Sequence, residues 1–511
     1  MLCVVNLIRS ENMIVISVLI LSVIFCMCYV TKTILWAIRA ANMTANIPGP
    51  KPLPIFGSAL ILVRVLDLKD LFKTWNDLLK KYIVSPDNIG KVWIGPKLFI
   101  SLGNPAHVKA VLSSQDALQK NFLYEFFAIF GNGLLVRNGH EWRDLRKPLD
   151  KLLTKNMVES NLEVFHENAL KFCEVINKYA DSQEMFNVKH YVANFAVDNL
   201  SVSSFGYNIN ELERDRYHLG EVSEELFENI AKYLLQFPFK LGVPYTSLRV
   251  RKYTKPLWNA ANEMLQGRIE SKKLLNEEMD EKYSYYSDVL IEKALKDKLS
   301  LKATGRLTGD FLIAGYDTSS ATISHALLLL AMHPEQQEAA YQEQLHILGD
   351  DPEIVPTWEQ LSKMEHLTRI LKEVMRLNSP PNIFRKLTKD IDLGEYKLPE
   401  GTTAIISFIT LHRNPNFWSH PNEFYPDHFL PEECAKRPKD CYFPFSWGPR
   451  ACPGSVYAMV LNKILISTVI RRYKLETDLK FDEIEFKYSL LLEVSQGYPI
   501  KIKQRTSSNS S

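Results

Sequence analysis

This chain of 511 residues lacks the cysteine pattern that indicates disulfide pairing. Its seven cysteines are an odd number with irregular spacing, and two of them lie inside an apolar run near the N-terminus. This pattern excludes the disulfide framework of a small secreted protein. No Cys-x-x-Cys pair occurs either, which argues against a structural zinc site.

An excess of charge of either sign is also missing. The net charge is +2 and the basic residues are scattered, so the sequence gives no support to nucleic acid as a partner. Residues 60–500 contain no Gly/Ser linker, no block of like charge and no internal repeat. Length alone would allow about three domains at roughly 150 residues each, but this uniformity favours one large, mainly helical domain.

Uncharged apolar runs are scarce, with one exception at the N-terminus, Met13 to Val30. A helix of this length would measure about 27 Å, close to the hydrocarbon thickness of a bilayer. A cleaved signal peptide is the alternative, but the following residues, Thr31 to Trp36, make a poor cleavage site. We therefore expect an uncleaved anchor. Lys32 and Arg39 after the run place the bulk of the protein in the cytosol by the positive-inside rule.

A proline-rich segment, Ile47 to Gly57, follows the apolar run. It has four prolines in seven positions, which cannot form a helix and predict a stiff, extended hinge. The sequence thus divides into four parts. These are an anchor (1–31), a basic and proline-rich hinge (32–57), a large domain (58–505) and a polar tail (506–511).

One cysteine, Cys452, occupies a turn rich in glycine and proline. The following run, Ser455 to Arg471, has the apolar spacing of a helix, so the cysteine lies just before a helix N-terminus. Backbone N–H groups and the helix dipole favour a thiolate there, and Arg450 is placed to meet an anion. Gly448 can adopt backbone angles closed to other residues, and Gly454 lets a flat partner approach. A buried free cysteine is the simpler alternative, but the combination suits haem iron with an axial sulfur.

A longer apolar stretch, Leu307 to Met332, predicts the central helix of the fold. Thr318 lies four residues after Ala314, so its hydroxyl can bond the Ala314 carbonyl and open the helix locally. Gly315 in mid-helix costs about 1 kcal/mol relative to alanine. Asp317 beside Thr318 supplies an acid and an alcohol that can relay protons. The alternative is a Ser/Thr-rich helix that packs through small residues.

Two residue pairs stand at helical spacing. Trp142 and Arg146 could grip one carboxylate from the same helix face, although a solvated basic helix is the alternative. Glu373 and Arg376 can form an ion pair, and their apolar neighbours favour a buried pair over an exposed one worth under ~1 kcal/mol. The segment Thr357–Gln360 predicts a capping box that opens the helix carrying this second pair.

Strand signals are few. Val92 to Ile100 predicts a hairpin, and Tyr396 to Ile409 predicts strands around the turn Pro399–Gly401. The aromatic-rich stretch from Asn121 to Gly133 is too irregular for a clean helix and forms either an aromatic core or the wall of a lipophilic pocket. The predicted fold class is therefore mainly α with a small β region, preceded by one transmembrane helix.

The turn around Cys452 has the complete pattern Phe-x-x-Gly-x-Arg-x-Cys-x-Gly and resembles the cysteine loop of the cytochrome P-450 family. The resemblance extends from Ile47 to Lys503. Four other segments are similar to motifs of the same family: Trp142-x-x-x-Arg146, Ala314-Gly-x-Asp-Thr318, Glu373-x-x-Arg376 and Pro426-x-x-Phe429.

The resemblance implies the cytochrome P-450 fold and a role for each motif. Cys452 would be the axial iron ligand of haem b, in a loop shaped by Gly448 and Gly454, while Asp317 and Thr318 would manage protons. The residues implied at the haem propionates are Trp142, Arg146, Arg385 and Arg450. The residues implied in bracing the core are Glu373, Arg376 and His428. In this last set His428 replaces the family's usual arginine; a histidine can donate a hydrogen bond but can lose its charge near neutral pH.

Two short phrases, Met332–Glu335 and Arg471–Leu475, resemble insect microsomal members of the clan that includes fatty-acid ω-hydroxylases. Members of that clan that bind haem covalently have a glutamate at the place of Ala314, so we expect non-covalent haem. The implied reaction inserts one atom of dioxygen into a lipophilic substrate. The alternatives are a haem–thiolate isomerase or dehydratase, and a non-enzymatic haem-binding sensor.

The resemblance also implies partners. Electrons would come from NADPH through NADPH–cytochrome reductase, with cytochrome b5 as a further partner, at the endoplasmic reticulum membrane. A positive surface for an acidic redox partner could be formed by Arg143, Lys147, Lys151 and Lys155.

Overall fold

A computed structural model describes most of the 511 residues. The described ranges are 2–64, 70, 73–74, 77–78, 88–131, 133–182, 184–236, 248–274, 285–296, 298, 300–489 and 491–505. The predicted polar tail, 506–511, lies outside them.

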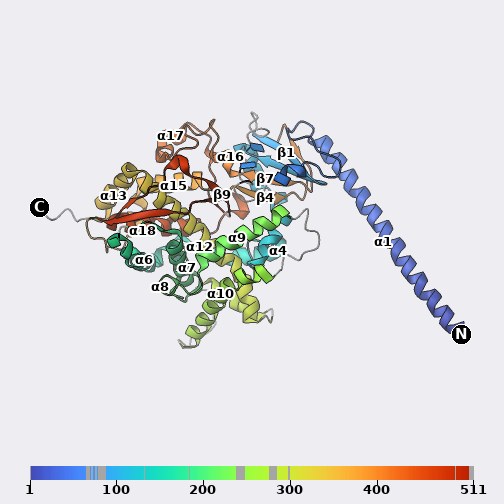
Figure 1. Ribbon diagram of the computed structural model, residues 1–511, viewed down its shortest axis with the longest axis horizontal. Coiled ribbons are helices and arrows are strands. Elements are labelled where there is room, and N and C mark those ends of the chain that lie inside the picture. Colours follow the sequence, from blue (N-terminus) through green and yellow to red (C-terminus); the bar gives the residue numbers. More distant parts are fainter. Residues whose placement is uncertain are drawn as a thin grey trace.

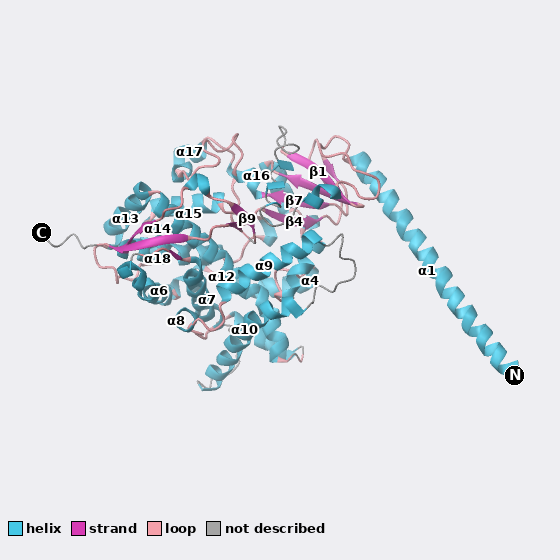
Figure 2. Cartoon of the chain, in the orientation of Figure 1, coloured by secondary structure: helices cyan, strands magenta, loops and turns pink. Residues whose placement is uncertain are grey.

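Helices make up most of the body, as predicted (Figure 2). Those longer than eight residues are α3 (Pro105–Ser113), α4 (Gly139–Leu152), α6 (Leu162–Ser182), α7 (Lys189–Phe205), α9 (Leu219–Gln236), α10 (Leu248–Leu274), α11 (Tyr286–Lys296), α12 (Leu301–Met332), α13 (Pro334–Leu348), α15 (Glu365–Leu377) and α18 (Ser455–Arg472). Shorter helices are α5 (Lys155–Ser160), α8 (Glu211–Arg214), α14 (Trp358–Lys363), α16 (Phe408–His412) and α17 (Pro431–Ala435). The helices predicted at 307–332 and 455–471 are confirmed as α12 and α18.

The main sheet has the order β1-β2-β7-β4. Its strands are β1 (Ile89–Ile94), β2 (Lys97–Leu102), β7 (Thr403–Ser407) and β4 (Asn382–Lys386). The predicted hairpin is confirmed, because β1 and β2 pair antiparallel around a turn at Gly95, where φ is +56°. β2 and β7 run parallel, and β4 and β7 run antiparallel.

The remaining strands form three small sheets. They are β3 (Phe186–Asn187) with β11 (Pro499–Gln504) and β8 (Tyr473–Glu476), β9 (Phe486–Tyr488) with β10 (Leu492–Val494), and β5 (Ile391–Asp392) with β6 (Lys397–Leu398). The strands predicted within 396–409 are β6 and β7. They pair with different partners rather than with each other, and the chain turns into α16 at Phe408.

The core is built around α12, which packs on α7, α10 and α18 (Figure 1). Most side chains of α12 are fully buried, since other helices cover it on several sides. Gly315 permits one of these close approaches: a Cβ there would lie 2.6 Å from Cδ2 of Leu200 on α7. A second, smaller apolar cluster fills the space around the main sheet.

The predicted capping box is present, with Thr357 accepting from Gln360 N–H and the Gln360 side chain accepting from Thr357 N–H. It opens a short helix, α14, that ends at Lys363. The Glu373–Arg376 pair lies on the next helix, α15, after a break at Met364. The single helix predicted here is therefore two helices, because Met364 leaves helical backbone geometry with ψ of 75°.

The N-terminal helix α1 (Leu2–Met43) projects away from the body, beside the main sheet (Figure 1). Its segment Ile16–Met43 has a mean hydropathy of 2.2 and is long enough to cross a membrane. The helix continues through residues 32–43, which were predicted as part of a hinge. Trp36 Nε1 donates to the Glu400 carbonyl at 2.7 Å, and its ring meets Trp93 edge-on. The end of α1 is therefore attached to the body.

Candidate active site

The loop carrying Cys452 precedes the N-terminus of α18, as predicted. Gly448 has φ of +73°, and a Cβ there would lie 2.1 Å from the Leu112 carbonyl oxygen of α3, so only glycine fits. A hydrogen bond from the Cys452 N–H to the Phe445 carbonyl, at 2.9 Å, closes the loop. A Cβ on Gly454 would meet only the Cys452 sulfur, at 4.0 Å. The space beside the sulfur at Gly454 is thus open.

The electrostatics of Cys452 differ from the expectation. Its side chain is solvent-accessible although it lies deep among protein atoms, and this burial raises the pKa of the thiol. Gly454 N–H and the Arg146 guanidinium both act to lower that pKa, but desolvation outweighs them. The helix N-terminus alone does not set the charge of this sulfur.

Several cations gather beside the Cys452 loop. Arg450 donates to the carbonyls of Leu118, at 3.1 Å, and Arg137, at 2.9 Å, and its guanidinium lies 4.0 Å from the ring centroid of Trp142. Arg146, one turn along α4 from Trp142, donates to the Ala451 carbonyl at 2.6 Å.

Arg385 and Lys120 complete this group. Arg385 is fully buried on β4, and Lys120 lies in the chain between α3 and α4. Burial, together with the charges of Arg385 and Arg450, lowers the pKa of Lys120 well below its usual value. Burial and the charge of Arg385 likewise lower the pKa of Arg450 to about 9. These groups repel one another in a region of low dielectric constant.

No carboxylate among the described residues pairs with Lys120, Arg385 or Arg450; Arg146 alone has one, the exposed Asp150 at 2.6 Å. Buried cations require anionic partners. A flat macrocycle with two propionates would supply both charges beside the accessible sulfur. The residues present therefore fit haem.

Between Thr308 and Ala331 of α12 one narrow stripe is partly accessible while the other residues are buried. It consists of Phe311, Ala314, Gly315 and Thr318, at spacings of one helical turn. The predicted bond is confirmed: Thr318 Oγ1 donates to the Ala314 carbonyl at 2.7 Å. Phe311 packs against Tyr286 and Gly315 faces Leu200, so Ala314 and Thr318 form the open part of this stripe.

Asp317 does not lie on this stripe. It is 1 % exposed, and neither of its oxygens has a hydrogen-bond partner among the described residues. Burial raises the pKa of Asp317 to about 6, while the charge of Lys189 acts to lower it. Lys189, at the start of α7, pairs with Glu493 of β10 at 2.7 Å with both side chains almost fully buried.

The ion pair beside Asp317 leads towards the surface. Lys487 on β9 lies 3.8 Å from Glu493 and also pairs with Glu224 of α9, whose side chain is 40 % exposed. Charged groups therefore connect the neighbourhood of Asp317 to solvent.

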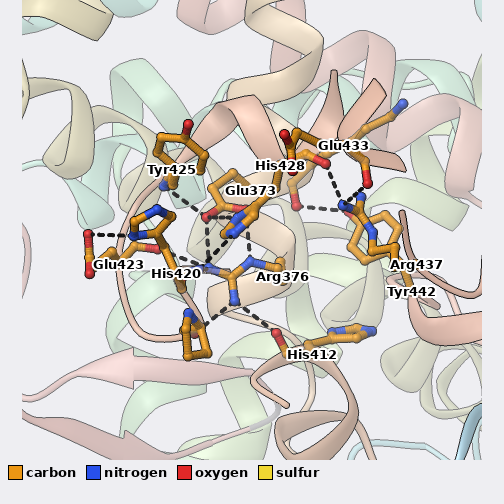
Figure 3. A network of polar contacts seen from close by, with 12 residues as sticks. Glu373, Arg376, His412, His420, Glu423, Tyr425, His428, Glu433, Arg437 and Tyr442 are labelled. Atoms are coloured by element: carbon orange, nitrogen blue, oxygen red, sulfur yellow. Dashed lines mark hydrogen bonds and ion pairs between the residues drawn. The ribbon is translucent and has the colours of Figure 1, made fainter. Parts of the chain in front are cut away.

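Glu373 and Arg376 form a fully buried bidentate pair, at 2.8 and 2.7 Å (Figure 3). Arg376 also donates to four backbone carbonyls between 412 and 423, including those of His412 and Pro421 at 2.8 Å. Burial opposes ionisation of Glu373, but hydrogen bonds from Arg376 and His428 outweigh it and lower the pKa of this carboxyl. The pair ties α15 to the chain that leads to the Cys452 loop.

His428 lies in a short 3-10 helix, η4 (Pro426–Phe429), and contacts Glu373 through Nδ1 at 3.2 Å (Figure 3). Its Nε2 accepts the backbone N–H of His420 at 3.2 Å. A ring nitrogen that accepts carries no proton, so His428 is neutral and donates from Nδ1. The three-residue contact exists, with a neutral donor in place of a charged one.

No sequence motif includes Lys120, Lys189 or Glu493. Each is an isolated charge in a stretch without a recognisable pattern, and Lys189 and Glu493 are 304 positions apart. Only their proximity to other charged groups in the folded protein identifies them as part of the site.

Comparison with known proteins agrees with this fold. The family model described as Cytochrome P450 matches residues 47–501. Cytochrome P450 4c3 of Drosophila melanogaster is 30% identical over 492 residues, covering 91% of each chain. Cytochrome P450 4c21 of Blattella germanica is 31% identical, covering 88% of this chain and 91% of its own. Human Cytochrome P450 4V2 is 29% identical over 88% of each. The predicted resemblance to insect members is confirmed.

The helical fold and this match over most of the sequence define a haem–thiolate oxidoreductase. The chain belongs to the cytochrome P450 family and is a P450 monooxygenase. The cofactor is haem b with a cysteine thiolate as iron ligand, and the electrons come from NADPH through a reductase.

Proposed function

We propose that this protein is a membrane-anchored monooxygenase that inserts one oxygen atom from O2 into a lipophilic substrate at the endoplasmic reticulum membrane. The observation that carries the proposal is a group of cations beside the accessible Cys452 sulfur, the buried Arg385 and the half-buried Lys120 and Arg450, which have no carboxylate partner among the described residues. Such a group is costly unless it meets bound anions.

In this proposal the Cys452 thiolate would hold the haem iron, and Arg385 and Arg450 would hold the haem propionates, supported by Trp142 and Arg146. Lys120 joins them as a further cation. Bound haem supplies the activation of dioxygen. Ala314 offers no carboxylate at the position where covalent members have glutamate, so the haem is held by these contacts alone.

The chain's own residues then manage protons. Thr318, on the open stripe of α12, holds a hydroxyl whose proton is shared with the Ala314 carbonyl at 2.7 Å. Asp317 has a pKa raised to about 6 by burial, so it can take and release protons near neutral pH. The charged groups from Lys189 to Glu224 provide a route by which solvent protons reach Asp317.

Four exposed cations on α4 and α5 support the proposed redox surface. They are Arg143, Lys147, Lys151 and Lys155. An acidic face of the reductase, or of cytochrome b5, would meet them with complementary charge. We also propose 1–31 as the anchor and 58–505 as the catalytic domain, with 32–57 as the connection between them.

The test is the difference spectrum of the dithionite-reduced protein with carbon monoxide. We expect a strongly red-shifted Soret band, lost in Cys452→Ser because a neutral hydroxyl is a poor iron ligand. Cys441→Ser, at a buried free cysteine eleven positions earlier in the chain, is the matched control and keeps the band. A normal thiolate-type band in Cys452→Ser would contradict the assignment.

Turnover then separates the alternatives. A monooxygenase consumes NADPH in the presence of reductase and forms a product with one added oxygen. An isomerase or dehydratase acts on its substrate without NADPH, and a sensor shows no turnover. Either of those results would overturn the proposed reaction.

A further inference from the structure

The chain between η3 (Phe122–Ile129) and α4 touches α12 backbone to backbone, one turn before Ala314. A Cβ on Gly131 would lie 2.2 Å from the Arg306 carbonyl, and a Cβ on Gly309 would lie 2.0 Å from the Phe130 carbonyl. Glycine on both sides permits this contact. The segment is thus held directly against the central helix.

Asp310 forms a hydrogen bond across this contact. It is 1 % exposed, and its Oδ2 accepts the backbone N–H of Leu135 at 2.8 Å. Its Oδ1 has no hydrogen-bond partner among the described residues. A buried carboxyl with one free oxygen is unfavourable, so its presence here calls for a role.

The same segment continues to Arg450. Arg450 Nη2 donates to the Arg137 carbonyl at 2.9 Å and to Asn138 Oδ1 at 3.1 Å. Asn138 Oδ1 also accepts the backbone N–H of Lys120 at 2.8 Å. Residues 133–138 therefore connect α12 to the guanidinium beside the Cys452 loop.

We propose that Asp310 is a positioning residue: its bond to Leu135 N–H fixes residues 133–138, and through them sets the place of Arg450. This inference rests on the proposed function only in giving Arg450 a haem propionate as its partner. A hydrogen-bond acceptor is what the position needs, and the negative charge is not. Oδ2 can accept this bond whether the carboxyl is ionised or carries its proton on Oδ1.

The first experiment is amide hydrogen exchange of the full-length holoprotein, read on peptides covering 133–138. We expect Asp310→Ala to speed exchange there about fivefold to tenfold, as loss of one hydrogen bond predicts. Asp310→Asn keeps an oxygen acceptor and restores slow exchange. Asp310→Val lacks the acceptor but fills the space, and it replaces Asp310→Ala if that variant does not fold.

Asp198→Ala is the matched control. Asp198 is another buried carboxyl whose oxygens accept backbone N–H groups, those of Glu211 and Leu212, far from this segment. It should speed exchange at 211–212 and leave 133–138 unchanged. Unchanged exchange at 133–138 in the variants lacking the acceptor, or equal acceleration there in Asp198→Ala, would overturn the positioning role.

The second experiment measures transfer of haem to apomyoglobin. We expect two- to fivefold faster haem loss in Asp310→Ala than in Asp310→Asn, with the carbon monoxide band of the remaining holoprotein intact. Fast exchange with unchanged haem loss would overturn the link to Arg450. Absence of the band in the unmutated protein would instead refute the proposed function, and the exchange result would stand apart from it.

Discussion

At Glu373, one fully buried carboxylate accepts hydrogen bonds from a guanidinium, an imidazole and the backbone N–H of Tyr425. His428 is neutral, so the ion pair is balanced one charge to one, and the histidine adds a donor without adding charge. The lowered pKa of Glu373 makes a contribution to stability that is present above its ordinary pKa of about 4.5. That contribution is lost as the pH falls through the lowered value.

Replacing His428 tests this arrangement. We expect His428→Ala to lower the free energy of unfolding by about 1–3 kcal/mol, because it removes a buried donor and leaves Glu373 and His420 N–H less satisfied. His428→Asn can place an N–H near the position of Nδ1 and should recover part of the loss. Denaturant melts at pH 7 measure both variants. Equal stability of the alanine variant and the original protein would contradict the bracing role.

Thr318 and Thr322 give a second comparison at the residue scale. Both hydroxyls donate to the carbonyl four residues earlier, but Thr318 is on the open stripe and Thr322 is buried. We expect Thr318→Ala to keep haem and to divert several-fold more NADPH to peroxide, because the proton donor near the open stripe is lost. Thr322→Ala should keep the original coupling. Product formed per NADPH decides, and unchanged coupling in Thr318→Ala would refute the relay role.

At the scale of elements, α1 illustrates how one helix serves two environments. Its apolar stretch has no buried side chains from residue 16 to 32 and suits lipid, whereas its end packs on the sheet through Trp36 and the fully buried Ala40. Arg39 adds an exposed ion pair with Asp390, worth little by itself. The proline-rich segment that follows is also held, since Lys91 N–H donates to the Pro48 carbonyl at 2.8 Å.

Truncation separates these two parts of α1. We expect deletion of residues 2–31 to leave the melting temperature of the soluble domain nearly unchanged. Deletion of residues 2–43 should lower it by a few degrees, because it removes the buried contacts of Trp36 and Ala40. Calorimetry in the same detergent measures both. Equal melting temperatures would show that residues 32–43 belong to the predicted hinge and add nothing to the stability of the body.

At the scale of the whole molecule, buried carboxyls and buried histidines change the stability in opposite directions as the pH changes. Burial raises the pKa of Asp198 to about 6, of Asp310 to about 7 and of Asp317 to about 6. The contribution of these carboxyls to stability is fully present below their ordinary pKa near 4. It is lost as the pH rises through the raised pKa values. Burial lowers the pKa of His325 and His412 to about 3. Their contribution is present above about pH 6.5 and lost as the pH falls.

Asp310→Asn removes the contribution of one buried carboxyl to the pH dependence of stability. The variant cannot ionise, so its stability relative to the original protein should rise between about pH 4 and pH 7 and level off above that range. The slope is at most about 1.4 kcal/mol per pH unit, the value of one proton. Melting temperatures of both proteins across this range measure it. A difference that is constant with pH would contradict the raised pKa of Asp310.

The sequence by itself determined the apolar N-terminal helix, the helices at 307–332 and 455–471, the hairpin around Gly95 and the Thr318–Ala314 bond. All of these depend on local periodicity, turn residues or spacings within one or two helical turns, which a linear pattern records. The family motifs are equally local, so the cysteine loop and the Glu373–Arg376 pair could be found without a structure.

Only the tertiary structure decided which distant groups meet. It gathered Lys120 with Arg385 and Arg450, turned Asp317 away from Thr318 towards Lys189 and Glu493, and joined Asp310 to Leu135. Burial and the directions of side chains follow from helix packing, and they fix protonation through desolvation and neighbouring charge. No pattern in the sequence carries these quantities, because some of the interacting groups, such as Lys189 and Glu493, lie 304 positions apart.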